Sequence, residues 1–97
     1  MLKKKKPPSL PKNIKIGDIL KVVWDDHFSN SRWRDIGDAV GDSPYTVESF
    51  GVYVGVNQKV NGLVIAQNHV LDTPTVSDTM TMLWPNIKSI ERIRRAD

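Results

Sequence analysis

The sequence contains no cysteine. This absence excludes disulfides, thiolate metal ligands and a cysteine nucleophile, and it fits a reducing compartment such as the cytosol. Long hydrophobic runs are also missing, because no apolar stretch approaches the ~20 residues that cross a membrane. The lysine-rich start has no apolar segment after it, so we do not expect a secretory signal there. The sequence therefore predicts a soluble cytoplasmic protein without a membrane segment.

Sequence motifs of catalysis are absent as well. There is no G-x-S-x-G elbow, no glycine-rich phosphate loop and no spaced pair of histidines. Asp25 and Asp26 are neighbours at the end of a predicted strand, so their side chains would point to opposite faces and make a poor carboxylate pair. Nothing in the surrounding pattern would orient His27 or His69. We therefore expect a protein that is not an enzyme and that binds no metal or cofactor.

Acidic residues are missing from the start of the chain, where residues 1–16 contain six lysines and no acid. Residues 17–80 contain four basic and nine acidic residues, and residues 81–97 contain four basic and two acidic ones. The net charge of +3 thus hides an acidic body between two basic ends. A nucleic-acid-binding body usually has a basic face, and here only the ends could provide one.

The first segment, "KKKKPPSLPK", combines a run of like charge with prolines, which favours an extended chain. We expect residues 1–13 to form a disordered, solubilising tail and residues 14–97 to form one small domain. The alternative is a nonspecific nucleic-acid arm, although no aromatic residues alternate with the lysines to stack on bases. The lysines of that arm would be Lys3, Lys4, Lys5 and Lys6.

Alternating apolar residues predict short strands. One such run of apolar residues follows the Gly17–Asp18 turn, and others are "YTVESFGVYVGV", "LVIAQNHV" and "TMTMLW". Residues 25–44 predict a long loop with a helical turn at "RDIGDAV". A change of apolar parity at Phe50–Gly51 predicts a bulge or bend, and Asn61–Gly62 predicts a hairpin turn. The segment 86–95 fits either helical turns or a last strand after a 3₁₀ turn.

These elements together predict the fold class. Five short strands, a corner glycine, a long first loop and a short turn before the last strand describe an all-β, five-stranded SH3-like or Sm-like barrel. Met80, Met82 and Trp84 alternate on one predicted strand and are expected to belong to the core. If that strand is at a sheet edge, pairing between subunits would cover it, so we expect a homo-oligomer.

An ordered set of short motifs runs through the folded part of the chain. In order, they are Trp24-x-Asp26, Trp33, "ESFGVYVG" with Ser49 and Gly51, "GLVIAQ", Pro85 and "IKSIERI". This set resembles a group of short bacteriophage proteins with the pattern W-x-D, W, S-x-G, VLA, P and I-x-S-I. The resemblance covers about residues 19 to 93. It departs at Trp84, which stands before the proline, and in the lysine tail.

The resemblance implies a virus-encoded accessory protein that acts in the cytoplasm of the host bacterium. It implies a small barrel and brings no catalytic residues with it. The leading hypothesis is a non-enzymatic binding module that binds or sequesters a small anionic, nucleotide-like ligand, such as a signal of host defence. The alternatives are a protein–protein adaptor or inhibitor of a host enzyme, and nucleic-acid binding through the basic ends.

Two tryptophans on either side of a polar loop mark the candidate site. Trp33 is expected to fold back beside Trp24 and close the end of the barrel, with Asp26 accepting hydrogen bonds from the loop or from the Trp33 indole. Arg32 and Arg34 could then point outward and bind a base and a phosphate together. The full candidate set is Trp24, Asp26, Arg32, Trp33, Arg34, Ser49 and Phe50.

Overall fold

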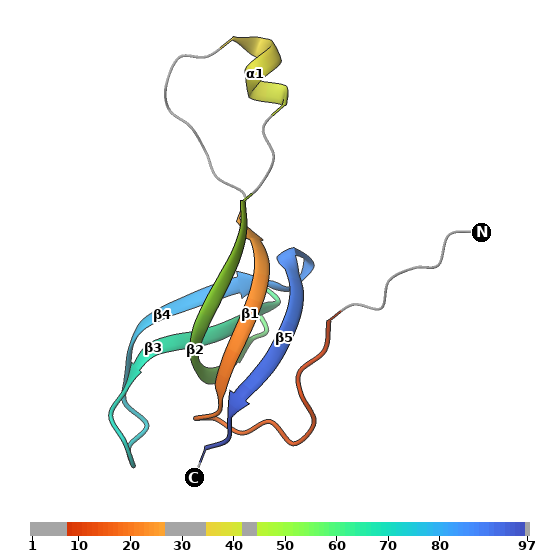
Figure 1. The fold of residues 1–97 in the computed structure, drawn as a ribbon. Helices are drawn as coiled ribbons and strands as arrows, with labels where there is room; N and C mark the ends of the chain where they lie inside the picture. Colours follow the sequence, from red (N-terminus) through yellow and green to blue (C-terminus); the bar gives the residue numbers. More distant parts are fainter. Residues whose placement is uncertain (1–7, 27–34, 42–44, 97) are drawn as a thin grey trace, which may run out of the picture.

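The computed structural model describes residues 8–26, 35–41 and 45–96. It is all-β, with five antiparallel strands in one sheet of order β4-β3-β2-β1-β5 (Figure 1). The strands are β1 (Ile19–Asp26), β2 (Tyr45–Asn57), β3 (Gly62–His69), β4 (Val76–Leu83) and β5 (Ile87–Arg94). A short helix, α1 (Ile36–Val40), lies between β1 and β2, and a 3₁₀ turn, η1 (Trp84–Asn86), lies between β4 and β5.

The sheet curls but is not closed into a barrel. Strands β1 and β5 run side by side with the first part of β2, while β3 and β4 cross them at a steep angle (Figure 1). Closure requires the two outer strands to pair, and in the described part of the chain β4 and β5 remain the two edges. The predicted all-β class with five strands is confirmed. The predicted SH3-like or Sm-like barrel is not confirmed, because the sheet is open.

Local alternation places most of the strands correctly. Leu20 and Val22 are buried on one face of β1, as the alternation predicts. β3 lies between β2 and β4 in the sheet, which suits its run of four apolar residues from 63 to 66. The last segment is strand β5 after the 3₁₀ turn, which is one of the two structures that the isoleucine spacing allowed.

The bend in β2 lies a few residues later than the sequence predicts. The register between β2 and β3 shifts between Tyr53 and Gly55, so Val54 is the extra residue of the bulge. Gly51 has a different role, because a Cβ there would lie 2.9 Å from the Ala66 carbonyl oxygen. The glycine therefore allows close approach of β2 to β3, and the backbone register decides where the bulge falls.

The core lies between the two halves of the curled sheet. Its cluster of buried side chains comprises Leu20, Val22, Leu63, Ile65, Met82 and Ile87. Met80 and Trp84 pack against this cluster, which agrees with the predicted core role of the methionine strand. β4 is an edge strand, but its backbone is kinked at Asp78, which has a φ of 54°. Such a kink interrupts the flat edge that another strand would need for pairing.

The segment before β1 contacts the sheet. Leu10 and Ile14 pack against the core cluster, and the Lys12 carbonyl oxygen accepts hydrogen bonds from Arg92 at 2.9 and 3.0 Å. The expectation of a disordered tail through residue 13 overlooked these contacts, because they join residues about 80 positions apart. Residues 1–7 lie outside the described residues, so the expectation stays a prediction there.

We predict that Gly51→Ala lowers the free energy of unfolding by about 2 kcal/mol, as overpacking of a tight contact does. The added methyl group would meet the Ala66 carbonyl oxygen and the Ile65 side chain at 2.9 Å. Gly37→Ala in α1 is the matched control, because no atom lies within 4 Å of its added Cβ. Urea unfolding followed by tryptophan fluorescence measures both. Equal stability of the two variants would show that β2 can move away from β3 without cost.

Candidate functional site

Trp24 and Ser49, two residues of the predicted site, lie together on the inner face of the sheet. The Trp24 indole N–H donates a hydrogen bond to the Ser49 hydroxyl oxygen at 2.9 Å. Trp24 also packs against the core cluster. Because its ring is half-buried and its polar atom is satisfied within the fold, this tryptophan acts as a structural residue.

The other described residues of the predicted site divide between the two faces of the sheet. Asp26 pairs in register with Tyr45 at the end of β1 and, two residues after Trp24, lies on the same face as Trp24 and Ser49. Phe50 pairs with Lys21, so it lies on the face of the sheet opposite Ser49, and it is half exposed. The described members of the set thus occupy both faces. Arg32, Trp33 and Arg34 lie outside the described residues, so a loop that binds a ligand stays a prediction.

Asp18, which the sequence marked only as part of a turn, is the buried charged residue of the described chain, at 1% exposure. Its Oδ1 accepts a hydrogen bond from the Ala96 backbone N–H at 2.6 Å. Its Oδ2 accepts one from the Lys15 N–H at 3.0 Å and one from Arg92 Nη1 at 3.2 Å. A buried carboxylate is tolerated when it is paired and hydrogen-bonded in this way.

Arg92 extends this network to the start of the chain. The side chain of Arg92 is 15% exposed. Besides Asp18, it donates to the Lys12 carbonyl oxygen through both Nη atoms and to the Asn13 carbonyl oxygen at 3.4 Å. One arginine therefore ties the segment before β1 to β5, and Asp18 ties β1 to the segment after β5.

The network also sets the protonation of Asp18. Burial alone raises the pKa of this carboxyl, because it disfavours the charged form. The backbone hydrogen bonds from Ala96 and Lys15 lower it, and so do the hydrogen bond and charge of Arg92. The net effect holds the pKa of Asp18 below its ordinary value. Asp18 is therefore ionised at neutral pH and neutralises Arg92.

The two basic ends of the sequence meet around this network. Lys12 and Lys15 come from the segment before β1, and Arg94 and Arg95 come from the end of β5 and the residue after it. We call these four residues the basic pole. Arg92 is paired with Asp18, so the pole adds four cations around a neutral pair. The sequence shows basic charge at both ends, but their meeting depends on contacts between residues 74 to 80 positions apart.

Two hollows open at this end of the molecule. A pocket of about 330 Å³, the terminal pocket, is lined by Asn13, Lys15, Asp18, Arg95 and Ala96. A larger groove of about 660 Å³, the turn groove, lies between the β3–β4 turn and the chain around the start of β1. Its lining includes Ile16, Ile19, Val52, His69, Leu71, Pro74 and Arg94. Both volumes fall near the range of small-molecule sites.

Other kinds of site find no support in the described ranges. Within residues 8–26, 35–41 and 45–96, histidine, aspartate and glutamate side chains form no group of three that could hold a metal ion. Over the same residues, no helix has the length and apolar character to span a membrane. The geometry of the described chain therefore directs attention to the basic pole.

We predict that Asp18→Asn lowers the free energy of unfolding by about 3 kcal/mol at pH 7, because it leaves Arg92 without its buried partner. The pKa of Asp18 is lowered by folding, so its contribution is complete above the unfolded value of about 3.9. That contribution is lost as the pH falls through the folded value. The stability gap between wild type and variant should thus shrink below about pH 4.

Urea unfolding at several pH values tests this. Asp25→Asn is the control, because Asp25 makes a surface ion pair with Lys88 at 3.5 Å and should cost at most about 1 kcal/mol. A gap for Asp18→Asn that stays constant from pH 7 to pH 3 would contradict the lowered pKa. A cost no larger than that of Asp25→Asn would contradict the anchoring role.

Comparison with known proteins returns no relative. No protein-family model, no curated protein and no solved structure matches the chain. A function for this chain is therefore argued from its residues and from the geometry of the basic pole.

Proposed function

We propose that this chain is a non-enzymatic binding module that holds a phosphate-bearing, nucleotide-like ligand at the basic pole. The observation that carries the proposal is the meeting of both chain ends around Asp18 and Arg92. This meeting gathers Lys12, Lys15 and the C-terminal arginines at one end of the sheet. Lys15 and Arg95, from separate parts of the chain, thus line one pocket, and Arg94 lines the groove beside it.

The chemistry of the pole suits phosphate. Arginine and lysine provide charge-assisted hydrogen bonds to phosphate oxygens. The terminal pocket places Lys15 and Arg95 in one lining of about 330 Å³, which is the lower end of the size of ligand sites. The carboxylate of Asp18 also lines this pocket, but it is paired with Arg92. Its negative charge is therefore balanced and does not repel an anion strongly.

The fold agrees with a binding role, and we propose that it is an opened member of the SH3-like type. The five strands, the long first connection and the 3₁₀ turn before β5 support this kinship. The resemblance to bacteriophage proteins suggests the context of the ligand. In a bacterial host, a virus-encoded module of this kind would sequester a nucleotide signal. Fold likeness alone does not assign a function, so the proposal depends on the pole.

Phosphate can come from two sources, a free nucleotide or the backbone of a nucleic acid. Lys3 to Lys6 precede the pole in the sequence and would add contacts along a longer polymer. Neutralising several backbone phosphates makes affinity fall steeply with salt. A free nucleotide has only a few phosphates and shows a shallow dependence. The salt dependence therefore distinguishes the two sources.

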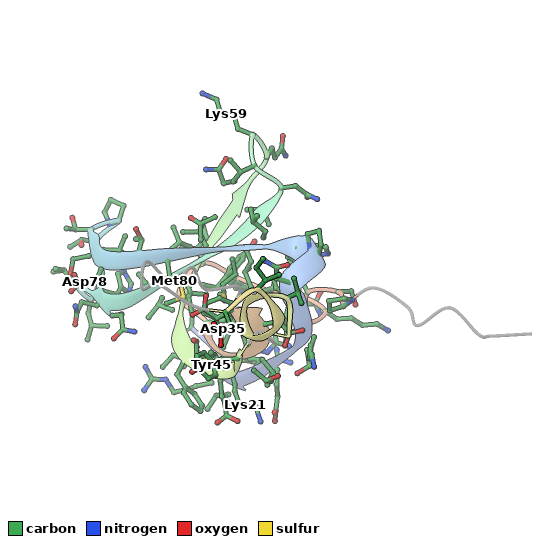
Figure 2. All side chains as sticks on the ribbon, turned by 90° about the horizontal axis from the view of Figure 1, so that it is seen from above. Lys21, Asp35, Tyr45, Lys59, Asp78 and Met80 are labelled. Atoms are coloured by element: carbon green, nitrogen blue, oxygen red, sulfur yellow. The ribbon has the colours of Figure 1, made fainter. Side chains whose placement is uncertain are left out.

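We predict that Lys15→Gln/Arg95→Gln weakens binding of a nucleoside triphosphate by about tenfold or more, since a hydrogen bond to a charged group contributes about 1.5–3 kcal/mol. Lys59→Gln is the matched control, because Lys59 stands exposed at the tip of the β2–β3 turn, apart from the sheet (Figure 2). Titration calorimetry against adenosine triphosphate, a cyclic dinucleotide and a 12-base single-stranded DNA gives the affinities.

Wild-type and Lys59→Gln proteins should bind alike. Equal binding by the Lys15→Gln/Arg95→Gln protein, or no binding of any of the three probes by the wild type, would overturn the proposal. Deleting residues 1–7 then distinguishes the sources. Loss of DNA binding with unchanged nucleotide binding assigns the lysines to a polymer, and this deletion spares Leu10 and Lys12, whose contacts belong to the fold.

A further inference from the structure

The turn groove has aliphatic walls that are open to solvent. Ile16 is 70% exposed and Leu71 is 74% exposed, and both line the groove together with Ile19 and Val52. Large aliphatic side chains that gather in one exposed groove mark a surface that binds a partner. Among the described lining residues His69 carries the one ring, and its Nε2 is bound to the Thr73 carbonyl oxygen, whereas the exposed walls are aliphatic. An aliphatic partner fits it better.

The groove is held in a fixed shape by its own turn. The Thr73 N–H and hydroxyl both donate to the Val70 carbonyl oxygen, at 3.2 and 2.8 Å. His69 Nε2 donates to the Thr73 carbonyl oxygen at 2.7 Å, which requires the proton on that nitrogen. The Val70 N–H donates to the Thr75 carbonyl oxygen at 3.0 Å. Such a preformed wall lowers the entropic cost of binding.

Charge at the groove favours an acidic partner. Arg94 lines it, and Arg95 and Lys15 lie in the adjoining terminal pocket, which shares Ala96 with the groove. Asp72 is the acidic side chain of the lining. The surroundings are thus net positive, and the expected partner combines aliphatic and acidic side chains.

A segment of this same chain has that chemistry. Helix α1 presents Ile36 at 83% exposure and Val40 at 81%. These residues are four apart, so they lie on one side of the helix. Asp35 precedes the helix and is exposed. From Asp35 to Asp42 the sequence is "DIGDAVGD", which contains three aspartates and directly follows Arg34. Without a partner, these two aliphatic side chains would remain in water.

The helix and the groove lie at opposite ends of the molecule. Figure 1 shows α1 beyond the upper ends of β1 and β2, whereas the C-terminal end of β5 and the β3–β4 turn lie at the lower end. A chain cannot insert its own helix into its own groove across the sheet. A second copy can do so without any change in the sheet.

We propose that α1 of one copy docks in the turn groove of a second copy. Ile36 and Val40 would contact the walls formed by Ile16 and Leu71, and Asp35 would face Arg94. The contact is heterologous, since each copy uses two different surfaces, so it continues into a ring or a chain. It does not need edge pairing, which the kink at Asp78 in β4 opposes. This contact shares Arg94 with the basic pole, but it does not use Lys15 or Arg95, which line the terminal pocket.

Two variants with complementary defects test the contact. Ile36→Asp/Val40→Asp removes the aliphatic face of α1 and keeps the groove. Ile16→Ser/Leu71→Asp alters the groove and keeps α1. All four side chains are exposed, so both proteins should fold. Val60→Asp, at an exposed aliphatic residue of the β2–β3 turn, is the control. Sedimentation velocity over a hundredfold range of protein concentration gives the masses.

The wild type and Val60→Asp should grow in mass with concentration, and each double variant alone should stay monomeric. An equimolar mixture of the two double variants should stop at a dimer, because it offers one intact helix and one intact groove per pair. Wild type that stays monomeric throughout would overturn the proposal. Assembly of either double variant like the wild type would overturn it as well.

A charge exchange adds a readout that does not depend on folding of the double variants. Asp35→Lys and Arg94→Glu should each weaken association by at least about fivefold, and their mixture should recover it. A mixture no stronger than either variant alone would contradict the pairing of α1 with the groove. Circular dichroism confirms that each variant keeps its strands. The phosphate titrations use Lys15 and Arg95, so failure of one proposal leaves the other standing.

Discussion

The buried pair of Asp18 and Arg92 holds both ends of this chain in place. Strands β1 to β4 pair with their neighbours in sequence, β1 and β2 across a long connection that contains α1, whereas β5 returns to pair with β1 at the other edge of the sheet. Asp18 stands at the entry to β1, and Arg92 lies in β5. Their contact fixes the residues that flank this long-range pairing. Along the strands themselves, β5 is held by its hydrogen-bonded ladder with β1 and by the Lys21–Glu91 ion pair at 3.1 Å, and the buried pair adds the contact at the end of this ladder.

Burial strengthens this interaction but also imposes a desolvation cost on both charges. The attraction between two buried charges offsets the cost of their desolvation only when their remaining hydrogen-bonding atoms are also satisfied. Here the carboxylate accepts two backbone N–H groups, and the guanidinium donates to two backbone carbonyls. The backbone around Asp18 must therefore adopt one arrangement for the pair to form. The pair thus contributes to specificity as well as to stability.

The sequence predicts the parts of this fold that depend on local patterns. Leu20 and Val22 lie two residues apart on either side of Lys21, so their burial on one face follows from a period of two. The change of apolar parity predicts a bulge at Phe50–Gly51, whereas the structure has it at Val54. The two differ because apolar parity does not reveal the register between strands. Asp18 looked like a turn residue, since nothing local shows that it lies beside Arg92. Closure of the sheet, likewise, depends on global curvature that no short motif encodes.

In the candidate site, too, local patterns are visible in the sequence while the contacts between distant residues are not. A tryptophan beside an aspartate suggested a ligand surface around Trp24, yet its indole is bound to Ser49 within the fold. Within the pattern, Trp24 and Ser49 join β1 to β2, and Gly51 allows the close approach of β2 to β3. These three residues therefore have a structural role that the motif by itself does not reveal.

The distribution of charge follows from the same anchor. A chain with basic ends and an acidic body would place positive charge on two separate sides if its ends lay apart. The Asp18–Arg92 contact brings them together, so one end of the sheet becomes basic while α1, with Asp35 before it, stands at the other. The proposed anion site and the proposed contact between copies both use cations that lie beside this buried pair. Both proposals therefore depend on a single buried carboxylate.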